Sequence, residues 1–187
     1  MKRMGASVAL FALCFAGSAE AGHPKHVHDD IDPYSGQRIL SVAIDTGRCL
    51  VETSPDRNPS HVKLLLSAVR QPSAPVEYVL TLSLDGGEWI NPGKRGSLQT
   101  VIDGKQDELY MVGPKSAWKE WPAFSGTRHK VAKEVIPFGA DEEFVKNLAG
   151  AKAVQFRINA QNTSLERCTD AVSLRDVHEF LALAATL

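Results

Sequence analysis

The chain has 187 residues, with 21 lysines and arginines against 22 aspartates and glutamates, and a formal net charge of −1 at pH 7. Near-neutral charge excludes a general electrostatic attraction for nucleic acid or anionic lipid. The length and the 43% hydrophobic content suit one domain with a sizeable core.

The N-terminal end has the three parts of a cleavable export signal. Lys2 and Arg3 provide a basic start, and Ser7–Ala16 is apolar but shorter than the roughly twenty residues that span a bilayer. Ala19–Ala21 fits the small-residue cleavage rule. We therefore expect residues 1–21 to be removed, and the mature protein to be periplasmic or secreted and to have no membrane span.

Removal of the signal also removes Cys14 and leaves one pair of cysteines, Cys49 and Cys168. In an oxidising compartment such a pair is predicted to form a disulfide. It would close a loop of about 120 residues, which the chain-entropy model values at up to about 5 kcal/mol. The alternative is two unrelated buried thiols.

Residues 22–36 are polar and show no periodicity, so we expect a flexible lead-in that ends in a turn at Pro33–Gly36. The segment carries His23, His26 and His28 beside several aspartates. Imidazole and carboxylate are ligands for zinc, nickel or copper, so weak metal binding is one hypothesis. The alternative is a solvated tail in a protein that has no cofactor.

Residues 37–187 read as a single β-rich domain. Val76–Leu84 and Val154–Ile158 alternate apolar and polar residues with the period of a half-buried strand. Asp103-Gly104 is a hairpin signal. Further strands are expected at Gln37–Ile44, around Cys49, and at His61–Arg70, Leu98–Ile102, Glu108–Val112 and Thr127–Phe138.

Two late segments have helical patterns. Asp141–Ala149 has acidic residues in its first turn and is followed by Gly150. Ser173–Ala185 opens with a capping-box variant and carries an apolar stripe. Because strands and helices do not alternate regularly, we predict an α+β, mainly antiparallel β fold, a sandwich or partly open barrel with two helices late in the chain.

Aromatic and basic residues form the best candidate ligand surface. Trp89 precedes Lys94 and Arg95, while Trp118 and Trp121 lie three residues apart, a spacing that a helical turn would bring to one face. Aromatic faces beside basic groups can bind sugars or anionic ligands. The alternative is that these rings close one end of the sandwich.

Catalytic signatures are missing from the sequence: it contains no nucleophile elbow, no zinc-protease motif and no phosphate-binding glycine loop. We therefore identify no catalytic residue and expect a non-enzymatic domain that binds a small ligand or an envelope protein, and no nucleic acid. A hydrolase with a dispersed Ser, His and Asp site is a further alternative.

Three short motifs occur in a familiar order: Asp-x-x-Ser-Gly at Asp32–Gly36, the turn at Ile102–Gly104, and the strand Val154–Ile158 before a C-terminal helix. This layout resembles exported bacterial β-sandwich proteins that carry no assigned function. The resemblance implies a periplasmic setting and a sandwich fold, and it carries over no catalytic residue.

Overall fold

The computed structural model describes residues 26–47, 49, 61–85, 96–113, 116–120, 131–159 and 164–187. Within them the elements are β1 (Val27–Ile31), β2 (Arg38–Ile44), β3 (His61–Arg70), β4 (Glu77–Asp85), β5 (Ser97–Ile102), β6 (Lys105–Tyr110), β7 (Ser116–Glu120), β8 (Val131–Ala140), α1 (Glu142–Gly150), β9 (Ala153–Asn159), β10 (Ser164–Asp170) and α2 (Ala171–Ala184).

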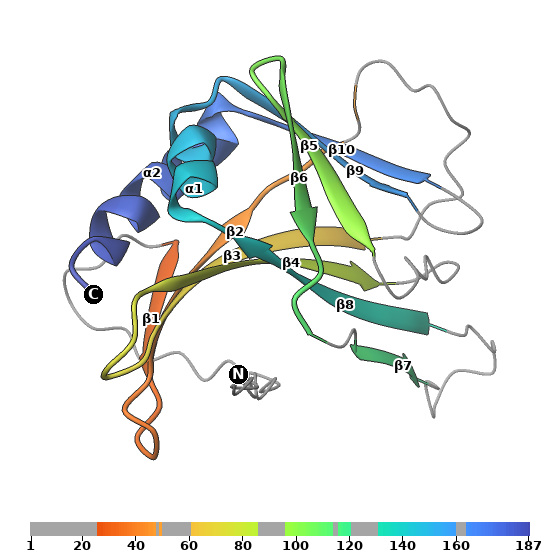
Figure 1. Cartoon of the computed structure of the whole chain (residues 1–187). Coiled ribbons are helices and arrows are strands. Elements are labelled where there is room, and N and C mark those ends of the chain that lie inside the picture. Colours follow the sequence, from red (N-terminus) through yellow and green to blue (C-terminus); the bar gives the residue numbers. More distant parts are fainter. Residues whose placement is uncertain are drawn as a thin grey trace, which may run out of the picture.

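The strands form two antiparallel sheets (Figure 1). The six-stranded sheet has the order β1-β2-β3-β4-β8-β7, and the four-stranded sheet has the order β10-β9-β5-β6. The predicted fold class is confirmed: the fold is mainly antiparallel β with two helices late in the chain. The sheets are not closed into a barrel.

The core lies between the inner faces of the sheets and the helices. The alternation predicted for the fourth and ninth strands is confirmed: alternate residues face the core, and all of them are buried except the half-buried Tyr78. The inward residues are Leu80, Leu82 and Leu84 in β4 and Val154, Phe156 and Ile158 in β9. They pack in one cluster with Leu40, Val42, Leu64, Leu66, Leu98, Ile136 and Phe138 of the other strands.

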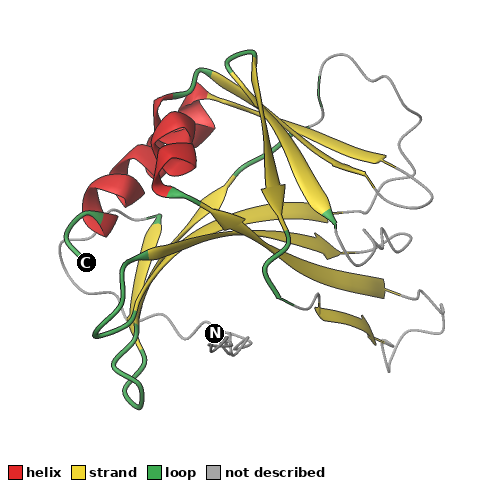
Figure 2. Ribbon diagram, in the orientation of Figure 1, coloured by secondary structure: helices red, strands yellow, loops and turns green. Residues whose placement is uncertain are grey.

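The two helices lie together at one side of the sheets (Figure 2) and bury Phe144, Leu148, Val177 and Phe180. The prediction of α1 is confirmed. Ser173 was expected to cap α2, but this is wrong: the helix begins at Ala171, directly after β10 ends. No helix in the described ranges is long and apolar enough to cross a membrane.

A disulfide joins the two sheets at one margin. Cys49 and Cys168 are bonded, with their Cα atoms 5.0 Å apart and a sequence separation of 119 residues. Next to the disulfide, Gly47 N–H donates to Cys168 O at 2.8 Å and Cys168 N–H donates back at 3.0 Å. The chain that leaves β2 is therefore fastened to the edge strand β10, which confirms the predicted pairing of the cysteines.

At the opposite margin the chain itself passes from one sheet to the other. After β6, Met111 forms a bridge with Phe138 of β8, and Val112 N–H donates to Pro137 O at 3.0 Å. Gly113 follows with a φ of +109°, a value that favours glycine. The next segment, β7, then pairs with β8. Such bends let one strand serve two sheets and make a corner between them.

Residues 22–36 were expected to form a flexible lead-in, but Val27–Ile31 within them form β1, which pairs with β2 along its whole length. Val27 is buried, and the Arg38 guanidinium donates to both carboxylate oxygens of Asp29, at 2.9 and 2.6 Å. These contacts outweigh the polar composition of the segment. The predicted turn follows, with Asp32 Oδ1 accepting from Tyr34 N–H at 2.9 Å.

Other boundaries differ in small ways. The Asp103-Gly104 hairpin is confirmed, but pairing resumes at once with Ile102 opposite Lys105, so β6 begins earlier than expected. The strands β7 and β10 were not predicted. Near Cys49, the described residues show a single bridge at Gly47 in place of the expected strand.

We expect the double variant Cys49→Ser/Cys168→Ser to lose about 2–4 kcal/mol of unfolding free energy, because the cross-link restricts the unfolded chain. Denaturant melts of oxidised, reduced and variant protein provide the measurement. Reduced wild type should match the variant. Two free thiols in the oxidised protein would contradict the disulfide.

We expect Gly139→Ala to weaken the corner between the sheets. A Cβ at Gly139 would lie 2.7 Å from Val112 Cγ1, so the valine must move, at a cost of about 1–3 kcal/mol. Adding Val112→Ala should restore most of the loss in thermal denaturation. Gly150→Ala is the control, because its Cβ meets nothing within 4 Å and should be neutral or stabilising.

Candidate functional site

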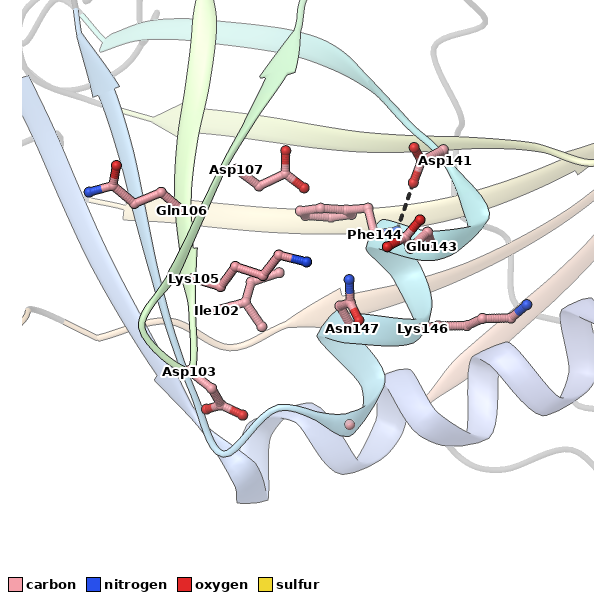
Figure 3. A pocket seen from close by; sticks show the side chains of 11 residues that line it. Ile102, Asp103, Lys105, Gln106, Asp107, Asp141, Glu143, Phe144, Lys146 and Asn147 are labelled. Atoms are coloured by element: carbon pink, nitrogen blue, oxygen red, sulfur yellow. Dashed lines mark hydrogen bonds between the residues drawn. The ribbon is translucent and has the colours of Figure 1, made fainter.

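A cleft of about 590 Å³ lies between the β5–β6 hairpin and α1 (Figure 3). The hairpin belongs to the four-stranded sheet, whereas α1 follows β8 of the six-stranded sheet. The cleft therefore lies where the two sheets and a helix meet. Its volume is in the range of small-molecule sites.

Asp103, at the hairpin turn, fastens one wall of the cleft to the segment after α1. Its carboxylate accepts from the N–H groups of Lys152 at 3.0 Å and Ala153 at 2.9 Å. Its own N–H donates to Ala153 O at 3.0 Å. Asp103 has a φ of +47° and Gly104 of +86°, the combination of a tight hairpin turn that aspartate and glycine tolerate. This carboxylate is engaged in holding the frame.

The helical wall begins with Asp141, whose Oδ1 accepts from Phe144 N–H at 2.7 Å and so caps α1. One turn along, Lys146 Nζ lies 2.7 Å from Glu142 Oε1, an interaction that raises the pKa of Lys146. Figure 3 shows the Lys146 side chain directed away from the hairpin. Asp141 and Lys146 therefore shape the helix more than they face the cleft.

Four polar side chains face the open space from opposite walls. Lys105 and Asp107 extend from β6 toward α1, and Glu143 and Asn147 lie on α1 opposite them (Figure 3). The ring of Phe144 lies between these groups in this view and is itself buried. Two carboxylates, an ammonium and an amide on rigid elements can orient a small polar ligand through charge-assisted hydrogen bonds.

A second hollow, of about 600 Å³, lies over the outer face of the four-stranded sheet and shares Gln106 and Asp107 with the cleft. Arg157 lines it and pairs with Glu166 on β10, with Nε to Oε1 at 3.4 Å. Glu108 accepts from Ser97 Oγ at 2.6 Å and from the Tyr110 hydroxyl at 2.8 Å.

The hydrogen bonds to Glu108 lower the pKa of its carboxyl group, with the bond from Ser97 as the larger cause. Charged groups on this outer face are thus held by their neighbours on adjacent strands. In the cleft, by contrast, the groups come from two separate elements that face each other. We therefore take the cleft as the candidate site.

The predicted aromatic and basic surface lies mostly outside the described residues. Trp89, Lys94, Arg95 and Trp121 are all outside, so convergence of these residues stays a prediction. Trp118 is in β7, with its backbone opposite Lys133 of β8. Because residues 116–120 are extended, the helical turn suggested for Trp118 and Trp121 is wrong at this position.

The histidines proposed as metal ligands are only partly placed. His23 lies outside the described residues, whereas His26 and His28 are both exposed. His26 Nδ1 is 4.0 Å from Asp176 Oδ2 of α2. Among the residues that the structure describes, no three His, Cys, Asp or Glu side chains form a metal-binding group. Metal binding stays a prediction.

The residues that line the cleft were not predicted from the sequence. Lys105 and Asp107 alternate with Gln106 on a strand, and Glu143 and Asn147 are one turn apart on a helix, but about forty residues separate the two pairs. One feature of the sequence could have pointed to them: Lys105 and Asp107 are polar but lie in the register of the buried Leu109, on the inward face of β6. That signal gives no indication of what lies opposite.

We expect Asp103→Ala to cost about 1–2 kcal/mol of unfolding free energy, because it removes the acceptor for two backbone N–H groups and places alanine at positive φ. Chemical denaturation measures the loss. Gln106→Ala, at an exposed position of the same hairpin, should change stability by less than about 0.5 kcal/mol. Equal losses in both variants would contradict a framing role for Asp103.

No protein-family model matches the chain, no curated protein is significantly similar to it, and no solved structure is significantly similar to its fold. The geometry and charges of the cleft are therefore the basis for a functional proposal.

Proposed function

We propose that the protein is a non-enzymatic binding domain of the periplasm, and that its ligand or partner group binds in the cleft between the β5–β6 hairpin and α1. The N-terminal segment has the pattern of an export signal. The Cys49–Cys168 disulfide is typical of proteins from oxidising compartments. Both features support a role outside the cytoplasm.

The facing walls of the cleft carry the proposal. The same open volume of about 590 Å³ is lined by Lys105 and Asp107 on the hairpin and by Glu143 and Asn147 on α1 (Figure 3). Elements that are held by backbone hydrogen bonds keep such groups in place before a ligand arrives, which reduces the entropic cost of binding.

The charge of the cleft favours a cationic ligand group. Its lining has four carboxylates, on Asp103, Asp107, Asp141 and Glu143, against two lysines. Backbone N–H groups already occupy Asp103 and Asp141, and the N–H of Glu108 donates to Asp107 Oδ1 at 2.8 Å, so Asp107 offers its second oxygen to the ligand. Asp107 and Glu143 face each other across the space, so we infer that the ligand presents an ammonium or guanidinium group between them.

A binding role is favoured over hydrolysis by the types of residue in the cleft. The described lining holds no serine, cysteine or histidine, the groups that supply a nucleophile and its base in the common hydrolytic triads. Metal binding by the N-terminal histidines is independent of the cleft, and no observation in the described residues favours it.

The test is a titration of the exported protein with 1,5-diaminopentane, followed by amide chemical shifts, with glutarate as the anionic counterpart. We expect the diamine to shift the amides of residues 105–107 and 143–147. Asp107→Asn combined with Glu143→Gln should weaken binding at least about tenfold, the effect of one lost charge-assisted contact.

Asp30→Asn is the matched control, because it removes an exposed carboxylate of β1 outside the cleft. It should leave binding unchanged. Equal responses to diamine and dicarboxylate, or shifts spread evenly over the surface, would contradict a cationic site in this cleft.

A further inference from the structure

The outer faces of the two sheets differ in chemistry. In an antiparallel sandwich the outer face of each sheet meets water and is normally polar. The four-stranded sheet mostly follows this rule, with Val101 and Tyr110 as the apolar or aromatic members of a face on which Gln99, Gln106, Glu108, Gln155 and Arg157 also point outward. The polarity of this outer face can be compared with that of the six-stranded sheet.

The six-stranded sheet departs from the rule across β2, β3, β4 and β8. The inward residues of these strands are buried, so the alternate positions within residues 39–43, 63–69, 77–83 and 135–139 point outward. We call this surface the outer β2–β8 face. Its larger side chains are the half-buried Ile39, Leu65, Val69, Val79 and Val135, whereas Pro137 in the same register is buried.

The rest of the outer β2–β8 face is small or neutral: serine, threonine, alanine and glycine occupy most of the remaining positions. Of its outward side chains only Lys63 and Glu77 are charged, and both are exposed. This face carries half-buried aliphatic side chains among small neutral residues and few charges, which favours an interaction surface.

We propose that a second copy of this chain stacks on the outer β2–β8 face, so that the protein forms a twofold-symmetric dimer. Stacked sheets pack with side chains interdigitating about 10 Å apart, and a face with short side chains permits this approach. A twofold contact places the same patch on both sides, and a nearly uncharged patch meets itself without repulsion.

The two charges of the face select one orientation. Lys63 lies near one end of β3, and Glu77 lies opposite Val69, six residues farther along that strand, or about 20 Å. A twofold axis across the strands reverses their direction in the second copy. Lys63 of each copy then approaches Glu77 of the other, whereas an axis parallel to the strands would bring lysine toward lysine.

The size of the face sets the expected strength. Four strands about 4.8 Å apart, over about 20 Å of length, give a footprint of about 400 Å² per copy. This is smaller than the roughly 800 Å² per partner of a standard interface. The dimer is therefore expected to dissociate at micromolar concentrations.

The first experiment is sedimentation velocity of the exported protein over the micromolar range, with a Val79→Arg variant. We expect a monomer–dimer equilibrium in the wild type and a dissociation constant at least about tenfold higher in the variant. Val101→Arg places the same change on the outer face of the four-stranded sheet and should leave the equilibrium unchanged. A wild type that stays monomeric, or equal effects of both arginines, would overturn the proposal.

A charge exchange tests the orientation without altering the apolar area. Lys63→Glu should weaken the dimer, since it brings two glutamates together at each end, and Lys63→Glu/Glu77→Lys should restore it to within about threefold of the wild type. Thermal melts confirm that each variant is folded. A double variant as weak as the single one would overturn this arrangement. Both tests read association alone, so their outcome is separate from that of the diamine titration.

Discussion

The fold depends on the attachment of two open sheets to each other at both margins. On the β10 side the attachment is covalent, through Cys49 and Cys168, and is extended by the paired backbone of Gly47. On the β6 side it is made by the chain crossing at Val112. Between these margins the inner faces bury their apolar residues against each other, and the helices cover one side.

This construction explains where the cleft lies. The helix α1 connects β8 of one sheet to β9 of the other, and so it stands at the junction beside the β5–β6 hairpin. Asp103 ties the hairpin to the chain after α1, and Asp141 caps the helix opposite. Asp103 and Asp141 thus hold the frame, Asp107 Oδ1 accepts from the N–H of Glu108 at 2.8 Å, and Asp107 and Glu143 line the cleft that we propose as the binding site.

The two proposed binding surfaces use different parts of the molecule. The cleft is at the junction of the sheets, whereas the outer β2–β8 face is on the far side of the six-stranded sheet from the core. A dimer formed through that face leaves both clefts open. The polar outer face of the four-stranded sheet, with Arg157 and Glu166 paired across strands, is suited to contact with water.

Local patterns in the sequence determined the fold class, the strands β4 and β9, the Asp103-Gly104 hairpin, the helix α1 and the cysteine pair. Each depends on periodicity, turn chemistry or simple counting within a short window. Tertiary structure decided what lacked such a signal: β1 is stabilised by Arg38 despite its polar composition, and β7 by its pairing with β8. Only the tertiary structure placed Lys105 and Asp107 opposite Glu143 and Asn147. The two pairs are about forty residues apart, and a local sequence pattern does not show which distant elements pack against each other.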